Sequence, residues 1–174
     1  FTCYAPGLGN VVSAQICMYS MDLGRLLTFP RFRETNSSPA WSPDGSQIMF
    51  MSSMSGDPEL FTTDSNGGQL KRITFTAGAN TSPAWNPKTG NRIAFVSDRS
   101  GVPQLYLMNA DGSNTEKLDL PDMGYVIDPA WSPSGQLLAF SWRRPNGNYD
   151  IYVMDVATRQ IVALTRDAGR NERP

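Results

Sequence analysis

A short segment that recurs three times at a nearly constant interval is the feature that most constrains the fold of this chain. The segment Pro-Ala-Trp-Ser/Asn-Pro occupies residues 39–43, 83–87 and 129–133, and successive tryptophans lie 44 and 46 residues apart. Each copy is followed in the same order by a glycine-bearing turn, an apolar run ending in Phe, a polar loop and a second apolar run. Such a chain is expected to fold as an array of similar units that bury their apolar faces against one another.

Each repeat unit has the pattern of short strands. Its apolar runs are too short for helices, are rich in aromatic and β-branched residues, and are separated by Gly, Asn, Asp and Pro. Four such strands in a unit of about 45 residues are typical of a β-propeller blade. We therefore predict an all-β fold, a β-propeller built from four-stranded antiparallel blades. A two-sheet sandwich is less favoured, because a sandwich does not need to repeat its sequence at a fixed period.

The repeat divides the chain into about four blades, three complete and one partial. Residues 1–3 align with the second strand of the following unit. We predict a partial blade at about 1–35, complete blades at 36–79, 80–125 and 126–170, and the start of a further inner strand at 171–174. Because uncovered sheet edges are a liability, we expect either a fragment of a longer propeller or a chain that completes a ring by association, for example as a homodimer.

Tryptophan and cysteine are both assigned to the interior. Trp41, Trp85 and Trp131 of the repeated segment are expected to pack between adjacent blades, because large apolar rings usually serve the core. Cys3 and Cys17 lie in neighbouring predicted strands, and alternation places their side chains on opposite faces if the intervening loop closes as in the other blades. That placement argues against a disulfide, so we predict two buried, free thiols.

Composition argues against most catalytic mechanisms. The chain has no His, which removes the commonest general base and the commonest zinc ligand, and two cysteines cannot replace it. Fifteen basic residues against 16 acidic ones leave neither a basic footprint for nucleic acid nor a polybasic membrane patch. No apolar run approaches ~18 residues, so no membrane span is expected. We expect a chain without catalytic residues, without a nucleic-acid partner and without a cofactor.

The best-preserved copy of the repeat runs from Ser82 to Gly112. It contains Ser-Pro-Ala-Trp-Asn-Pro, then Ile-Ala-Phe-Val-Ser-Asp-Arg-Ser-Gly-Val-Pro-Gln-Leu-Tyr-Leu-Met-Asn-Ala-Asp-Gly. This copy closely resembles the repeat of TolB and TolB-like propellers, and the resemblance extends over essentially the whole chain. The eukaryote-type WD repeat is a poorer match, because the chain has no Gly-His…Trp-Asp pattern.

The resemblance implies a periplasmic, non-catalytic protein of the Tol–Pal system, associated peripherally with the cell envelope. In that family a six-bladed propeller follows a smaller α/β domain and binds the peptidoglycan-associated lipoprotein Pal. The same repeats occur in propellers that gate serine peptidases of the prolyl oligopeptidase type, so a regulatory propeller of such a peptidase is the alternative. An excised blade array that assembles into a larger ring is a third interpretation.

A variable position directly before each repeated proline is the first candidate for partner binding. We label the four strands of a blade a to d from the inside outwards. The loops between d and a, and between b and c, then open on one face of the propeller. Repeat symmetry gathers the variable residues around the mouth of the central channel: Ser38, Ser82, Asp128 and Arg173. A purely structural role would not explain this variety. Asp128 is the only carboxylate well placed for a Ca²⁺ ion in the channel, so that cofactor stays an open alternative.

Two further sets of residues complete the predicted protein-binding face. Asn36 and Asn80 stand three residues before the repeated proline, where they either face a partner or stabilise turns through side-chain-to-backbone hydrogen bonds. The loops of the same face also contain arginines and apolar side chains of the kind enriched at protein interfaces. These are Arg33, Arg99, Arg144, Met123 and Tyr125. Interleaved acidic residues make an internally paired, solvated rim the competing interpretation.

Overall fold

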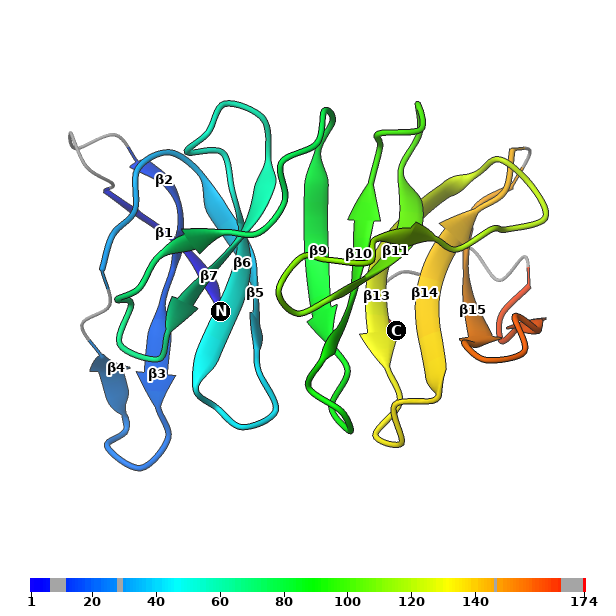
Figure 1. Cartoon of the computed structure of the whole chain (residues 1–174). Helices are drawn as coiled ribbons and strands as arrows, with labels where there is room; N and C mark the ends of the chain where they lie inside the picture. Colours follow the sequence, from blue (N-terminus) through cyan, green and yellow to red (C-terminus); the bar gives the residue numbers. More distant parts are fainter. Residues whose placement is uncertain (7–11, 28–29, 146, 167–173) are drawn as a thin grey trace.

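The computed structural model describes residues 1–6, 12–27, 30–145, 147–166 and 174 of the chain. All helices and strands that the structure assigns in these ranges are strands, with no helix among them. The strands form three four-stranded antiparallel sheets and two two-stranded ladders (Figure 1). The sheets follow one another in chain order and are not closed into a barrel. The predicted all-β propeller fold, with three complete blades and one partial blade, is confirmed.

Each complete blade is a meander in which sequence neighbours are also neighbours in the sheet. Blade 2 consists of β5 (Asn36–Trp41), β6 (Gln47–Ser52), β7 (Glu59–Asp64) and β8 (Lys71–Arg72). Blade 3 consists of β9 (Asn80–Trp85), β10 (Arg92–Ser97), β11 (Gln104–Asn109) and β12 (Glu116–Lys117). Blade 4 consists of β13 (Tyr125–Trp131), β14 (Leu137–Arg143), β15 (Tyr149–Asp155) and β16 (Ile161–Ala163). The a strands lie side by side, with β9 in contact with both β5 and β13.

The part of blade 1 that the structure describes includes no a strand, and its predicted c strand is interrupted at Cys17. The ladder of β1 (Thr2–Pro6) with β2 (Val12–Ile16) is followed by the ladder of β3 (Met18–Ser20) with β4 (Arg25–Leu27). Blade 1 contacts blade 2 through β1 and β2, which both touch β5.

A disulfide between Cys3 and Cys17 corrects the expectation of two free thiols. The β1–β2 ladder pairs Cys3 with Gln15, and Phe1 exchanges two backbone hydrogen bonds with Cys17 (2.9 and 3.0 Å). In this register the two cysteines are diagonal neighbours on the same face, with their Cα atoms 5.9 Å apart. The sequence prediction assumed a different register, and a shift of one residue moves every side chain to the opposite face.

Blade 3 has both faces buried, because it lies between two other blades. On β10, Ile93 and Phe95 belong to the apolar cluster shared with blade 2, whereas Ala94 and Val96 belong to the cluster shared with blade 4. All four side chains are buried. This double burial explains why the central strands have continuous apolar runs. Apolar and polar residues alternate along a strand only when one of its faces is in contact with solvent.

The repeated tryptophans join each blade to the blade before it. Trp85 is 8% exposed, and its Nε1 donates a hydrogen bond to the carbonyl oxygen of Ala40 (3.2 Å). Trp131 donates in the same way to the carbonyl oxygen of Ala84 (3.1 Å). The predicted packing between blades is confirmed for these two residues. Trp41 is 49% exposed, because blade 1 offers its indole no a strand to pack against.

The turns between strands a and b link the blades unequally. Asn86 Nδ2 reaches from blade 3 to the carbonyl oxygen of Gly135 in blade 4 (2.9 Å). The equivalent residue of blade 2, Ser42, instead donates to Asp44 of its own turn (2.6 Å) and accepts from the backbone N–H of Gln47 (2.9 Å). A cleft of about 480 Å³ therefore remains between these turns of blades 2 and 3.

Replacing Trp85 with Ala is expected to lower the free energy of unfolding by about 3–5 kcal/mol, because the change leaves a cavity between blades 2 and 3. Trp41→Ala is the matched control, and its loss should be clearly smaller because half of that side chain is already in solvent. Urea denaturation followed by far-UV circular dichroism measures both losses. Equal losses for the two variants would contradict the role assigned to Trp85.

The disulfide predicts that the denatured, unreduced chain contains no thiol that reacts with a thiol-specific reagent. After reduction, the same assay should detect two thiols per chain, those of Cys3 and Cys17. Detection of two reactive thiols in the unreduced chain, purified from an oxidising compartment, would restore the original prediction.

Candidate protein-binding face

The residues that precede the repeated Pro-Ala-Trp segments come together at one end of the a strands. Ser38, Ser82 and Asp128 line a single open pocket of about 350 Å³, which we call the mouth pocket. Its wall is completed by Pro39, Pro83, Pro129, Ala130 and Pro174. The predicted gathering of the variable positions is thus observed for three of them, and Arg173, the fourth, lies outside the described residues.

A bulge in each a strand determines where these variable side chains point. The ladder between strands a and b shifts register at this place in all three complete blades. Ser38, Ser82 and Asp128 have φ angles of 53°, 50° and 50°, in the left-handed region that side-chain-bearing residues rarely adopt. Because bulges re-aim side chains, a repeated backbone feature presents a variable side chain to the mouth pocket.

The loops around the mouth pocket form what we call the mouth face. It comprises the pocket, the segments 31–35, 73–79 and 119–124 that lead into the a strands, and the described residues of the b–c loops, 53–58, 98–103, and 144–145 with 147–148. All six lie at the same end of the blades, because β5, β9 and β13 begin there and the antiparallel β6, β10 and β14 end there (Figure 1). Arg33 and Met123 belong to the first group of segments, and Arg99 and Arg144 to the second.

Asn36 and Asn80 are fully buried beneath this face and do not reach its surface. Asn36 Nδ2 donates to the carbonyl oxygens of Arg33 and Glu34 (both 3.1 Å). Asn80 Nδ2 donates to the carboxylate of Glu59 in the preceding blade (2.9 Å). The two amides hold the segments that precede strand a and, at Asn80, join two blades.

Glu59 is the centre of a buried polar network between blades 2 and 3. Its side chain is 1% exposed and forms an ion pair with Arg72 (2.6 Å). The same carboxylate accepts hydrogen bonds from Thr74 and Asn80, and Asn80 in turn accepts one from Arg99 (2.7 Å). A buried carboxylate is stable only when its oxygens have such partners. The network therefore fixes the loop that leads from β8 into β9.

The three predicted arginines have different environments. Arg99 is half-buried, lies over the ring of Tyr106 (4.7 Å to the centroid) and is held by Asn80. Arg144 is exposed and pairs with Asp122, whose hydrogen bonds raise the pKa of the Arg144 guanidinium. Arg33 is exposed on the segment before β5. Arg33 and Arg144 are thus available on the mouth face, whereas Arg99 is largely used within the blade.

Met123 and Tyr125 are both exposed, as expected for contact residues, at 60% and 40%. The ring of Tyr125 is covered on one side by Arg143, which lies 4.5 Å from its centroid and 5.6 Å from that of Tyr149. This row crosses β13, β14 and β15, because Tyr125 pairs with Arg143 and Arg143 with Tyr149. Met123 is therefore the more accessible apolar side chain of the two.

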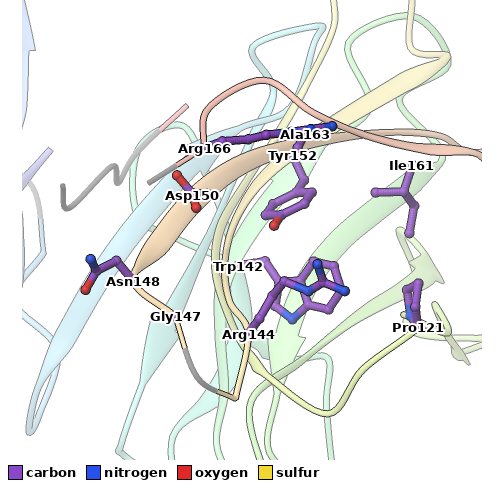
Figure 2. Close-up of a pocket in the computed structure, with 10 residues that line it drawn as sticks. All are labelled: Pro121, Trp142, Arg144, Gly147, Asn148, Asp150, Tyr152, Ile161, Ala163 and Arg166. Carbon is purple, nitrogen blue, oxygen red and sulfur yellow. The ribbon is translucent and has the colours of Figure 1, made fainter. Parts of the chain in front are cut away.

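A second pocket, which we call the rim pocket, adjoins the mouth face on blade 4 (Figure 2). It has a volume of about 480 Å³ and combines aromatic and charged side chains. Its lining residues are Pro121, Trp142, Arg144, Gly147, Asn148, Asp150, Tyr152, Ile161, Ala163 and Arg166. The Trp142 and Tyr152 rings are in edge contact, with centroids 4.9 Å apart.

Sequence reasoning missed most of the rim pocket, although one signal was present. Trp142 pairs with Val126 at the position where blades 2 and 3 pair Ser52 with Asn36 and Ser97 with Asn80. A bulky aromatic residue at this place departs from the repeat. The pocket itself combines three segments that are separate in sequence, so repeat alignment alone does not reveal it.

The turns at the opposite end of the blades use their carboxylates locally. Hydrogen bonds from Ser42 and Ser46 lower the pKa of Asp44 to about 2. Ser113 lowers the pKa of Asp111 in the same way. These acidic side chains stabilise the hairpin turns in which they lie.

Within the residues that the structure describes, no group of three or more His, Cys, Asp or Glu side chains is placed to hold a metal ion. The same part of the chain includes no helix of sufficient length and apolarity to cross a membrane.

The stacked four-stranded sheets, the bulged a strands and the shared mouth pocket define this protein as a β-propeller with a candidate binding face at one end of its blades. Residues 10–126 match the family model described as the TolB beta propeller domain. The chain belongs to this family, as its repeat predicted.

Individual relatives agree with this assignment. The chain is 36% identical over 179 aligned residues to a protein TolB homolog of Chlorobium chlorochromatii (strain CaD3), covering 92% of this chain and 39% of the relative. The crystal structure of TolB from Acinetobacter baumannii superimposes with a TM-score of 0.80 at 26% identity, over 91% of this chain and 39% of that one. The chain is also 32% identical over 76 residues to the uncharacterized peptidase YuxL of Bacillus subtilis (strain 168), covering 43% of this chain and 12% of the relative. The chain thus spans about two fifths of the TolB relatives.

Replacing Glu59 with Ala is expected to lower the free energy of unfolding by about 2–3 kcal/mol, because Arg72, Thr74 and Asn80 all lose a buried partner. Glu59→Gln is the matched control, since Gln15 and Gln104 are buried at the same position of blades 1 and 3. We expect the loss in free energy of unfolding for the Gln variant to be less than half of the loss for the Ala variant, as measured by urea denaturation. A Gln variant as unstable as the Ala variant would show that the charge, and not the hydrogen-bonding capacity, is required.

Proposed function

We propose that this chain is a non-catalytic binding scaffold of the bacterial cell envelope, whose mouth face contacts a protein partner in the periplasm. Membership of the TolB propeller family and the similarity to TolB proteins over most of the chain support this function. The partner we propose is the peptidoglycan-associated lipoprotein Pal of the Tol–Pal system. The chain spans about two fifths of its TolB relatives, so the proposal concerns a contact of Pal with the mouth face of this propeller and no other part of those relatives.

The observation that carries this proposal is the mouth pocket. Three blades contribute the same backbone bulge to one concave site, where it presents two serines and one aspartate, Ser38, Ser82 and Asp128. A repeated fold with a varied surface at its axis suits recognition, because the scaffold is kept while the contacts change. Arg33 and Met123 at its margin are of the types enriched in protein interfaces.

A gating propeller of a serine peptidase is the second candidate, and the similarity to the Bacillus subtilis peptidase favours it. In that case the chemistry would lie in a hydrolase domain outside this sequence. The coding sequence that flanks the chain separates the two candidates. A downstream domain with a Gly-x-Ser-x-Gly nucleophile elbow supports the peptidase, whereas an upstream α/β domain behind a secretory signal supports the TolB function.

The Pal proposal predicts that Ser82→Arg weakens binding to Pal of the same organism by about tenfold or more, because a long charged side chain then occupies the mouth pocket. Arg33→Glu, a charge reversal on the same face, should also weaken it. Biolayer interferometry with immobilised Pal measures both dissociation constants.

Ser134→Arg supplies the matched control, because Ser134 lies in the turn between β13 and β14 at the opposite end of the blades. Its dissociation constant should equal that of the unmodified chain. If Ser82→Arg and Arg33→Glu also bind Pal with unchanged affinity, the mouth face is not the Pal site.

A further inference from the structure

The rim pocket lies where blade 4 departs from the other blades. In every complete blade the b–c loop directs one side chain back onto the aromatic residues of strands b and c. In blade 3 this is Arg99, which donates to Ser97 (3.0 Å) and Asn80 (2.7 Å) and lies against Tyr106. In blade 2 the equivalent Met54 packs on the cluster of Phe50 and Phe61. In blades 2 and 3, a side chain of the same blade therefore covers the aromatic residues of strands b and c.

Blade 4 lacks both hydrogen-bond acceptors that hold Arg99 in blade 3. Trp142 replaces Ser97 and Val126 replaces Asn80, and neither side chain accepts a hydrogen bond. The equivalent arginine, Arg144, is instead held by Asp122, with Nε 2.9 Å from its carboxylate, and lies over the Trp142 ring at 5.3 Å. Its side chain remains 53% exposed. The space that Arg99 fills in blade 3 is therefore open in blade 4, and this opening is part of the rim pocket.

The rim pocket has an apolar half and a cationic half. Trp142, Tyr152, Ile161 and Ala163 provide the apolar wall, on the side of blade 4 that faces blade 3. Arg166 provides the free cation, because it takes part in none of the ion pairs or side-chain hydrogen bonds found among the described residues. The pocket volume, about 480 Å³, is within the usual range for small-ligand sites of ~300–1,000 Å³.

The acidic residues near the rim pocket are already engaged. Asp122 pairs with Arg144, and Asp150 is 9% exposed and accepts a hydrogen bond from the Thr165 hydroxyl (2.9 Å). In Figure 2 the Arg166 side chain extends away from Asp150, toward the side of the pocket where Tyr152 and Ala163 lie. The guanidinium of Arg166 is therefore directed to the aromatic side of the pocket, where its planar fork suits a carboxylate.

We propose that the rim pocket binds an acidic side chain of a peptide segment, with a neighbouring aromatic side chain of that segment packed on Trp142 and Tyr152. The carboxylate would pair with Arg166, and the aromatic group would bury the apolar wall. This inference goes beyond the proposed function, because it assigns a contact outside the mouth pocket and does not require Pal as the partner.

The test uses the peptide Ac-Phe-Glu-Ala-NH₂ and its isosteric control Ac-Phe-Gln-Ala-NH₂. The indole N–H resonance of Trp142, assigned with Trp142→Phe, is followed by NMR during titration of the unmodified chain. The indole signals of Trp41 and Trp85 serve as internal references, because they lie at the junctions of blade 2 with blades 1 and 3. We expect a saturable shift of the Trp142 signal with the Glu peptide. The affinity for the Gln peptide should be lower by a factor of about ten or more.

Arg166→Gln should reduce the affinity for the Glu peptide to that of the Gln peptide. Arg25→Gln, at an exposed arginine of β4 outside the pocket, is the matched control and should bind as the unmodified chain does. Equal affinity for the two peptides, no saturable shift at millimolar concentration, or equal behaviour of the two arginine variants would each overturn the proposal. None of these outcomes depends on Pal binding, so failure here is distinct from failure at the mouth face.

Discussion

The stability of each blade depends on burial of its faces by neighbouring blades, because a four-stranded sheet with two apolar faces cannot cover itself. The indoles of Trp85 and Trp131 combine both requirements of this junction. Each ring fills the apolar space between two sheets, and its N–H satisfies a carbonyl group of the preceding a strand. The equivalent Trp41 is half-exposed, because the described part of blade 1 offers no a strand to cover its ring.

The Glu59 network and the rim pocket lie at the same blade junctions, at the end where the a strands begin. The polar network of Glu59, Asn80 and Arg99 closes the junction of blades 2 and 3. Where Trp142 and Val126 replace two polar residues, no such network forms and the rim pocket opens. Small departures from the repeat, placed on a repeated backbone, thus create individual sites.

The fold was predictable from the sequence because its determinants are local and repeated: the turn residues, the short apolar runs and the interval between tryptophans. Three features depended on information that the repeat does not contain. The Cys3–Cys17 disulfide depends on the register of β1 and β2, in which the paired residues Cys3 and Gln15 are farther apart in sequence than their equivalents Ser97 and Gln104. The inward orientation of Asn80 depends on a carboxylate 21 residues away in the preceding blade. The placement of Arg166 and Trp142 in one pocket depends on packing between segments that the alignment treats separately.

The unequal turn contacts of the three complete blades have a consequence for the junction between blades 2 and 3. Blades 3 and 4 are joined twice at the turn end of their a strands, by the indole of Trp131 and by the Asn86–Gly135 hydrogen bond. Blades 2 and 3 have the indole contact and the Glu59 network, but Ser42 does not reach across at the turn end. The junction of blades 2 and 3 is therefore closed by the Glu59 network at the mouth end, and it opens to solvent at the turn end, in the cleft lined by Ser42, Trp85 and Lys88.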